Sequence, residues 1–236
     1  MCFSATASFG VGAALLGVGV ATFAKVQEPK QYPFAAIPIV FGLQQLIEGV
    51  VWLSLSNPDF LAYQRVATYA YLTFAQAIWP IFVPFAFMCL EPDPKRKKIM
   101  KWLTGIGLVI GAMLFSYFLS QTVTVEAEAH HIHYGLQKPE GFAFWHGLPY
   151  FIVIMIPPFI SSIPHMKWLA WSTLASFIVA KIFYSAYLLS VWCFFAAIVS
   201  AMVFLLLHFT ISRQTKTAFS QILPASPVFP PKESER

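Results

Sequence analysis

The sequence predicts an all-α membrane protein, a bundle of seven transmembrane helices with a short hairpin loop on its outer side. Of its 236 residues, 58% are hydrophobic and only 11% are charged, whereas soluble domains carry about 25% charged residues. Several apolar runs exceed the ~18 residues that suggest a bilayer span. Because backbone groups in lipid must be paired within the protein, each run is expected to form a helix. The alternating segments of ~10 residues typical of a membrane barrel are not seen.

Seven apolar runs are the expected spans. In chain order they are residues 5–24, 34–55, 66–90, 99–120, 144–163, 168–188 and 191–211. The first run lacks a preceding basic stretch and an evident cleavage site, so we interpret it as a span and not as a signal peptide. Only two residues separate the last two runs, which should therefore form a tight antiparallel pair. The chain divides into a transmembrane domain, residues 1–212, and a proline-rich tail, residues 213–236, that we expect to be disordered and cytoplasmic.

Two features of the spans predict how the helices pack. The first span carries small residues at helical spacing, which let a neighbouring helix come close. These are Gly10, Ala14, Gly17 and Ala21. In the third span, Pro80 and Pro84 should loosen the backbone hydrogen bonds of their helix.

The distribution of basic residues predicts the orientation. With the amino terminus outside, ten lysines and arginines fall on the inner side before the last stretch of the tail: Lys25, Lys30, Lys95, Arg96, Lys97, Lys98, Lys101, Lys167, Arg213 and Lys216. The outer side holds only Arg65 and Lys138. By the positive-inside rule this asymmetry places the carboxyl terminus in the cytoplasm. It also explains the net charge of +5 without a nucleic-acid partner; the expected partner is the lipid bilayer.

The outer loop between the fourth and fifth spans holds most of the histidines. Residues 122–134 alternate in polarity and contain β-branched residues, which predicts a strand. Residues 135–141 are expected to turn it back as a hairpin over the mouth of the bundle. On a single strand His131 and His133 point the same way, together with Val123 and Val125, while Glu126 and Glu128 point the other way.

His131 and His133 resemble two ligands of one metal ion. His146, at the start of the fifth span, is a candidate third ligand, and Cys2 a fourth. These donors suit zinc or copper, and a catalytic zinc site keeps one position open. The alternative is a hairpin with solvated histidines and no ligand, because H-x-H motifs often match by chance.

Two charged residues fall inside spans, where charges are costly and usually functional. Glu48 lies about 21 Å along its helix and Lys181 about 20 Å along its own, so both should sit at one depth. We expect an ion pair between them, with both residues as candidate catalytic groups. The nearby polar residues that would line an outward-facing ligand pocket are Gln44, Gln45, Gln76 and Tyr184. The alternative is a polar network that only locks the helices together. A retinal protein is disfavoured because Lys181 lies in the sixth span and not in the last.

The cysteines leave two possibilities open. Cys2, Cys89 and Cys193 contain no C-x-x-C pair, which argues against a thioredoxin-like motif. Cys2 and Cys193 both fall at the outer boundary, where they would form a disulfide in an oxidising compartment. Cys2 would instead remain a thiolate if it binds metal.

Two segments resemble a known family. Residues 1–9, MCFSATASF, and residues 41–49, FGLQQLIEG, with Trp52, are similar to the opening and second span of a family of uncharacterised bacterial multi-pass integral membrane proteins. The resemblance covers most of the chain up to the tail. It implies a protein of the bacterial inner membrane, and it adds weight to Cys2, Gln45 and Glu48 without naming their role.

Three function classes follow from these features. The first is an outward-facing metal-dependent hydrolase, with the histidines as ligands and Glu48 as a base, acting on an amphiphilic or small molecule from the outer side. The second is a transporter or channel whose path is lined by Glu48, Lys181 and the glutamines. The third is a non-catalytic scaffold whose loop binds another protein.

Overall fold

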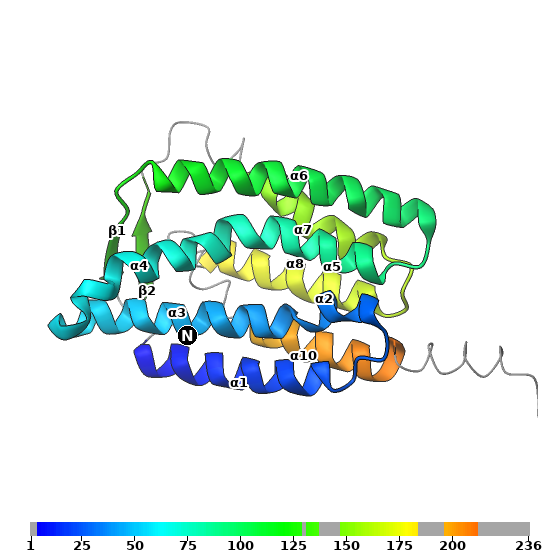
Figure 1. Cartoon of the computed structure of the whole chain (residues 1–236), viewed down its shortest axis with the longest axis horizontal. Helices are drawn as coiled ribbons and strands as arrows, with labels where there is room; N and C mark the ends of the chain where they lie inside the picture. Colours follow the sequence, from blue (N-terminus) through cyan, green and yellow to red (C-terminus); the bar gives the residue numbers. More distant parts are fainter. Residues whose placement is uncertain (1–3, 129–130, 137–146, 184–195, 212–236) are drawn as a thin grey trace, which may run out of the picture.

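The computed structural model describes residues 4–128, 131–136, 147–183 and 196–211, which form a bundle of helices with a β-hairpin at one end (Figure 1). The α-helices are α1 (Ala5–Phe23), α2 (Tyr32–Ala35), α3 (Ile37–Ser56), α4 (Leu61–Leu72), α5 (Trp79–Leu90), α6 (Pro94–Leu119), α7 (Leu148–Ile160), α8 (Met166–Phe183) and α10 (Ala196–Leu206). Short 3-10 turns are η1 (Pro29–Gln31) and η2 (Pro58–Phe60), and π-helical segments are η3 (Thr73–Ile78) and η6 (Leu207–Ile211). The strands are β1 (Thr124–Glu128) and β2 (His131–Gly135).

Five helical stretches of the described residues are long and apolar enough to cross a membrane. They are Ala5–Phe23, Pro29–Ser56, Pro58–Leu90, Pro94–Leu119 and Met166–Phe183. Two further apolar helices, Leu148–Ile160 and Ala197–Phe209, are shorter. The protein is thus mostly helical and fits a multi-pass membrane protein. The predicted runs 144–163, 168–188 and 191–211 extend into residues that are not described, so the count of seven spans stays a prediction.

Helices α1 and α3 touch through glycines. A Cβ atom on Gly12 would lie 3.1 Å from the carbonyl oxygen of Gly42, and the reverse distance is the same. Gly19 is equally tight, because its Cβ would meet the side chain of Ile39 at 2.4 Å. The prediction that Gly10 and Gly17 form the contact was wrong, since nothing lies within 4 Å of a Cβ built on either. Small residues occur on two faces of α1, and spacing alone does not tell which face packs.

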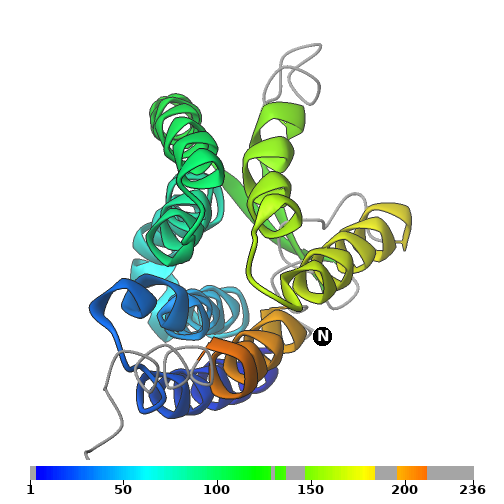
Figure 2. The ribbon, with the colours of Figure 1, turned by 90° about the vertical axis from the view of Figure 1, so that its right-hand side faces the viewer.

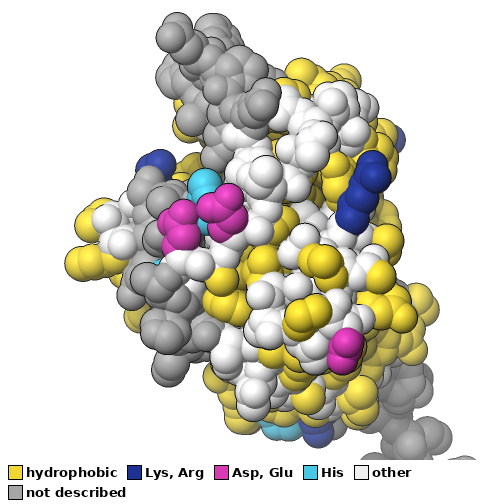
Figure 3. All heavy atoms as spheres, turned by 90° about the vertical axis from the view of Figure 1, so that its left-hand side faces the viewer, with side chains coloured by type: hydrophobic (Ala, Val, Ile, Leu, Met, Phe, Trp, Pro, Cys, Tyr) yellow, Lys and Arg dark blue, Asp and Glu magenta, His cyan; other side chains and the backbone are white. Residues whose placement is uncertain are grey.

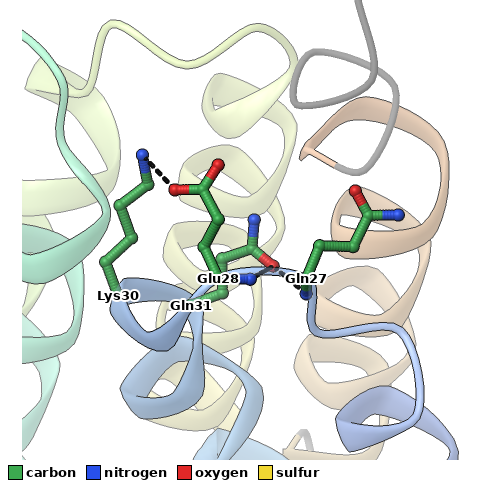
Figure 4. A network of polar contacts seen from close by, with 4 residues as sticks. All are labelled: Gln27, Glu28, Lys30 and Gln31. Carbon is green, nitrogen blue, oxygen red and sulfur yellow. Dashed lines mark hydrogen bonds and ion pairs between the residues drawn. The ribbon is translucent and has the colours of Figure 1, made fainter. Parts of the chain in front are cut away.

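The connection between α1 and α3 is held by Gln31, a fully buried residue at the end of η1. Its Oε1 accepts hydrogen bonds from the backbone nitrogen atoms of Gln27, at 2.8 Å, and Glu28, at 3.4 Å (Figure 4). The Glu28 carboxylate forms an ion pair with Lys30, with 2.6 Å between Oε2 and Nζ. These contacts cap the start of η1 and fix the reversal of the chain at this end of the bundle.

Helices α4 and α5 are joined by the π-helical segment η3, and Pro80 explains its position. The backbone nitrogen of Trp79 donates to the carbonyl of Phe74, five residues earlier, instead of to that of Ala75. Pro80 has no N–H to offer the Ala75 carbonyl in turn. The donor for the Ala75 carbonyl comes instead from α7, because the Tyr150 hydroxyl donates to the Ala75 oxygen at 2.6 Å. The local loosening expected from proline therefore takes the form of a one-residue shift in the backbone hydrogen bonds of this helix.

Helix α6 packs against the same segment through two glycines four residues apart. A Cβ on Gly107 would lie 1.8 Å from the Pro80 carbonyl oxygen, and one on Gly111 would lie 2.6 Å from that of Ala77. The Pro80 carbonyl has no helical donor four residues on, because that residue is Pro84. Glycine lets α6 approach this exposed backbone directly.

A buried glutamate ties two connections together at the end where α5, α6, α7 and α8 turn. Glu91 is 2% exposed and accepts a hydrogen bond from the Ser161 hydroxyl at 2.9 Å and from the backbone nitrogen of Ser162 at 3.0 Å. The Ser162 hydroxyl and the backbone nitrogen of Asp93 also donate to it. The Glu91 carboxylate therefore locks the α7–α8 turn onto the start of α6.

The hairpin is antiparallel, with Val125 opposite Tyr134 and Ala127 opposite Ile132. These pairs face the bundle, where Ile132 is fully buried and Tyr134 is 6% exposed. Because residues directly opposite share a face, the intervening pairs, Glu126–His133 and Glu128–His131, lie on the other face.

Two apolar clusters fill the bundle at different heights. The outer cluster lies under the hairpin and contains Val51, Trp52, Ala67, Tyr71, Leu72, Ala75, Phe118, Ile132 and Tyr134. The inner cluster includes Phe34, Ile37, Trp79, Phe87, Met100, Ile154 and Leu207. Seen from the end with the α7–α8 turn, α10 lies beside α1 and α8 lies beside α7 (Figure 2).

Replacing Gly107 by Ala tests the close contact of α6 with Pro80. The added Cβ collides with backbone and not with a movable side chain, so we expect a loss of stability of about 1–3 kcal/mol. Gly105→Ala is the matched control on the same helix, since a Cβ there meets nothing within 4 Å, and it should leave the stability unchanged or raise it by up to ~1 kcal/mol. Thermal unfolding of the detergent-solubilised variants, followed by circular dichroism, measures both. Equal midpoints for the two variants would contradict the packing.

Candidate functional site

The polar residues of α3 form the centre of the candidate site. Gln44 and Glu48 are fully buried and Gln45 is 1% exposed. Residues four apart on a helix share a face, so Gln44 and Glu48 lie one turn apart on the side that α3 turns toward its neighbours. The Gln45 side-chain nitrogen donates to the Glu48 carboxylate at 2.5 Å. A carboxylate and two amides thus sit inside a stretch apolar enough to cross a membrane.

Trp79 connects this group to the π-helical segment. It is the first residue of α5, and its indole nitrogen donates to the Gln44 side-chain oxygen at 2.6 Å. Its ring packs on Phe41 with centroids 3.9 Å apart. Gln76, predicted to line the pocket, is 8% exposed within η3 itself. The register change before Pro80 therefore determines which side chains of this segment are presented to α3.

Aromatic rings of α3, α4 and the hairpin pack together in the outer cluster. Tyr71 of α4 and Tyr134 of β2 stack with centroids 5.0 Å apart and planes 8° from parallel. Trp52, one turn from Glu48 on the same face of α3, packs in the same cluster. The hairpin thus covers this end of the bundle with apolar and aromatic side chains.

Three buried polar atoms close to this level have no hydrogen-bond partner among the described residues. They are Ser8 Oγ, Trp52 Nε1 and Thr68 Oγ1. Ser8 precedes Phe9, whose ring abuts Gly49, and Thr68 lies one turn from Tyr71 on α4. Buried polar atoms without partners are rare in native proteins and indicate a partner such as water, an ion or a ligand.

The two histidines of the hairpin, His131 and His133, lie on the hairpin face that does not carry Tyr134. The expectation that His131 and His133 share a face with Val125 was wrong, because the chain reverses between Glu128 and His131 and not after Gly135. The reversal pairs His131 with Glu128 and His133 with Glu126, on the hairpin face opposite to Tyr134. Acidic side chains and a histidine lie side by side on this end of the molecule (Figure 3). Among the described residues, no three histidine, cysteine or acidic side chains are grouped to hold a metal ion.

The expected ion pair between Glu48 and Lys181 is not present among the described residues, where Glu28 pairs with Lys30. Lys181 is exposed, one residue past the fully buried Ala180. Helix α8 packs on α7 and α10. The prediction was wrong because equal depth says nothing about which helix face carries a residue.

Several predicted site residues lie outside the described residues. They are Cys2, His146 and Tyr184, together with Cys193 of the predicted disulfide. The metal set of His131, His133, His146 and Cys2, and the disulfide between Cys2 and Cys193, therefore remain predictions.

Trp79, Tyr71, Thr68 and Tyr134 were missed as site residues. For Trp79 the sequence does hold a signal, because it is the one tryptophan that falls well inside a predicted span and not near an end. No comparable signal marks the others, whose role depends on how α4 and the hairpin meet α3.

The sequence was compared with known proteins. Residues 1–220 match a family of unknown function, DUF6629. No curated protein and no solved structure matches the chain.

Replacing Trp79 by Phe tests the link between α5 and α3. The ring is kept, but Gln44 loses the indole donor, so we expect the free energy of unfolding to fall by about 1–3 kcal/mol. Trp102→Phe is the control, because Trp102 is 69% exposed. Thermal unfolding by circular dichroism compares the two variants. A Trp79→Phe midpoint equal to that of Trp102→Phe would show that this hydrogen bond contributes nothing.

Proposed function

Because the protein belongs to the DUF6629 family of unknown function, its activity must be inferred from its own residues, and we propose that it is a multi-pass membrane protein that binds a small polar molecule at Glu48. The ligand would enter from the end that carries the hairpin. Gln44, Gln45 and Gln76 would supply amide contacts, and Trp52, Tyr71 and Trp79 would supply aromatic walls.

The observation that carries this proposal is the full burial of Glu48 within Pro29–Ser56, one of the apolar stretches. An ionisable group inside a membrane span costs several kcal/mol and is usually retained for function. Ser8, Trp52 and Thr68 add buried polar atoms that the described residues leave without partners. A bound polar molecule would give such atoms a partner.

The inner cluster favours binding over passage. Below Gln44, α3 presents Phe41 and Ile37, and the inner cluster of apolar side chains fills the bundle from there to the α7–α8 turn. A channel or transporter needs polar groups along its path in at least one state. Between Gln44 and its start at Ile37, α3 carries no polar side chain, which supports a site closed at its inner side.

We further infer that the hairpin end faces outward from the cytoplasm of a bacterial cell, in its plasma membrane. At the opposite end, the starts of α6 and α8 carry exposed lysines, among them Lys95, Lys98 and Lys167. The positive-inside rule assigns such an end to the cytoplasm. Exposed Trp102, Trp168 and Trp171 near the same end suit an interfacial belt.

Two buried glutamates give a matched test of the proposal. A carboxylate kept for binding costs stability, so Glu48→Gln, which retains an acceptor for Gln45, should raise the midpoint of thermal unfolding by a few degrees. Glu91→Gln should lower it, because Ser161 and Ser162 donate to both Glu91 oxygens and an amide group cannot accept on its nitrogen side. We expect that loss to be about 1–3 kcal/mol. Both variants are measured in one detergent against wild type.

The opposite result for Glu48 would overturn the proposal. If Glu48→Gln lowers stability as much as Glu91→Gln does, the carboxylate is a structural lock between helices. A non-catalytic scaffold would then be favoured over a protein that binds a small molecule.

A second candidate function is a metal centre on the outer face of the hairpin. The cross-strand pairs Glu126–His133 and Glu128–His131 place two carboxylates and two imidazoles on one face. These are donors that zinc accepts. In the set predicted from the sequence, His146 and Cys2 complete the pair formed by His131 and His133. A metal held there would supply activated water, and the protein would then be a hydrolase acting at the membrane surface.

Elemental analysis tests this candidate. For a metal centre we expect near-stoichiometric zinc or copper in the purified wild type and its loss in a His131→Ala/His133→Ala variant. Glu48→Gln is the control, since Glu48 lies in the bundle and should not affect the metal content. Wild type free of metal after incubation with either ion would exclude the metal centre and leave the Glu48 site unaffected.

A further inference from the structure

The end of the bundle with the α7–α8 turn carries a basic and aromatic surface that the proposed function does not use for binding. From Pro94 to Trp102, α6 holds five basic residues and no acidic one. Lys167 follows at the start of α8. The side chains of Lys95, Lys98 and Lys167 are exposed, and none of the three forms an ion pair with a described residue. A partner of this surface would be independent of any ligand at Glu48.

The described acidic side chains at this end already have partners. Glu91 is buried and accepts hydrogen bonds from the α7–α8 turn. Asp93 caps the start of α6, since its Oδ1 accepts from the backbone nitrogen of Arg96 at 2.8 Å. Glu28 pairs with Lys30. The exposed lysines therefore give this end a surface of positive charge, which attracts anions.

The starts of α6 and α8 flank the same end of α7, which lies between them (Figure 2). From α6, the Arg96 Nη1 atom donates to the carbonyl oxygen of Ile160, the last residue of α7, at 2.9 Å. From α8, the ring of Trp171 packs edge-on against that of Phe159, with centroids 5.2 Å apart. The basic residues of the two helices thus belong to one surface around the end of α7.

The two helix starts repeat one arrangement of a lysine and a tryptophan. Lys98 and Trp102 are four residues apart on α6, so they share a face. Lys167 and Trp171 have the same spacing on α8. The tryptophans are 69% and 58% exposed. Both helices run from this end into the bundle, so each tryptophan lies about 6 Å deeper than its lysine.

A phospholipid presents its groups in the matching order. The phosphate lies outermost, the ester carbonyls lie below it, and the acyl chains follow. A lysine ammonium group can pair with the phosphate while an indole N–H one turn deeper donates to an ester carbonyl. Basic clusters next to a transmembrane helix attract anionic lipids, and tryptophan is enriched at the membrane interface. A soluble anion would use the lysines but would gain nothing from exposed indole rings.

We propose that the starts of α6 and α8 bind anionic phospholipids of the phosphatidylglycerol type from the membrane leaflet on this side. Lys98 and Lys167 pair with the phosphates, and Lys95 adds to the attraction. Trp102 and Trp171 donate to the ester carbonyls. If the lysines instead only fix the orientation of the chain in the membrane, no preference among lipids is expected.

Native mass spectrometry of the full-length protein measures the lipid preference. The detergent-solubilised protein is mixed with equal amounts of phosphatidylglycerol and phosphatidylcholine that have the same acyl chains. The adducts of each lipid then give the ratio of the two affinities. We expect phosphatidylglycerol to bind roughly five-fold more tightly. Equal affinities for the two lipids in wild type would overturn the proposal.

Charge variants locate the preference. Lys98→Gln/Lys167→Gln should abolish it, because phosphatidylcholine carries no net charge and gains little from the lysines. Arg65→Gln/Lys181→Gln is the matched control, since it removes the same charge from exposed positions elsewhere and should keep the preference. Circular dichroism confirms that each variant is folded. If the control loses the preference to the same extent, the overall charge of the protein attracts the lipid and the assignment to α6 and α8 is wrong.

Trp102→Phe/Trp171→Phe isolates the indole groups. Both lipids have ester carbonyls, so this variant should weaken the binding of both by the same factor, about three- to ten-fold, and leave their ratio unchanged. Wild-type affinity for both lipids in this variant would overturn the contact between the indoles and the ester groups.

The soluble head group glycerophosphoglycerol separates a lipid from a free phosphate ester. Without acyl chains it should not displace phosphatidylglycerol when added at equal concentration. Displacement at that concentration would assign the surface to a soluble anion and overturn the lipid as its partner.

Discussion

The packing of the helices at the centre of this fold depends on Pro80, whose backbone nitrogen cannot donate a hydrogen bond. Pro80 shifts the backbone hydrogen bonds between α4 and α5 by one residue, so that the Trp79 nitrogen donates to the carbonyl five residues earlier. The displaced carbonyl of Ala75 is taken up by Tyr150 of α7. The carbonyl of Pro80 itself is met by Gly107 of α6. One covalent feature of the backbone therefore determines contacts with two other helices and directs Trp79 toward Gln44.

The two buried glutamates, Glu48 and Glu91, have different surroundings at the two ends of the bundle. Glu91 is surrounded by hydroxyl and backbone donors from the next connection, which is how a folded chain keeps a buried charge for structural purposes. Glu48 has an amide from its own helix as its described donor and aromatic rings beyond it. The full burial of Glu48 within an apolar stretch is the physical basis for proposing binding at Glu48 and a structural role at Glu91.

Hydropathy predicted the helical stretches and singled out Glu48, because a charge in an apolar run stands out without knowledge of its neighbours. Properties that depend on rotation about an axis were not predictable. The face of α1 that packs, at Gly12 and not Gly10, and the exposure of Lys181 both required the neighbouring helix to be known. The prediction for the hairpin was wrong for a related reason. Alternating polarity indicates a strand but does not locate the chain reversal. The position of the turn decides whether His131 lies on the same face as Val125 or on the same face as Glu128.

The outer cluster has a consequence for the order in which the protein assembles. Every member of it, from Val51 to Tyr134, lies in the part of the chain that precedes α7, whereas the inner cluster needs residues up to Leu207. A two-stranded hairpin is marginal on its own, but during synthesis it emerges after the helices that support it. The hairpin and the outer cluster can thus pack while the carboxyl-terminal helices are still on the ribosome, and the inner cluster is completed last.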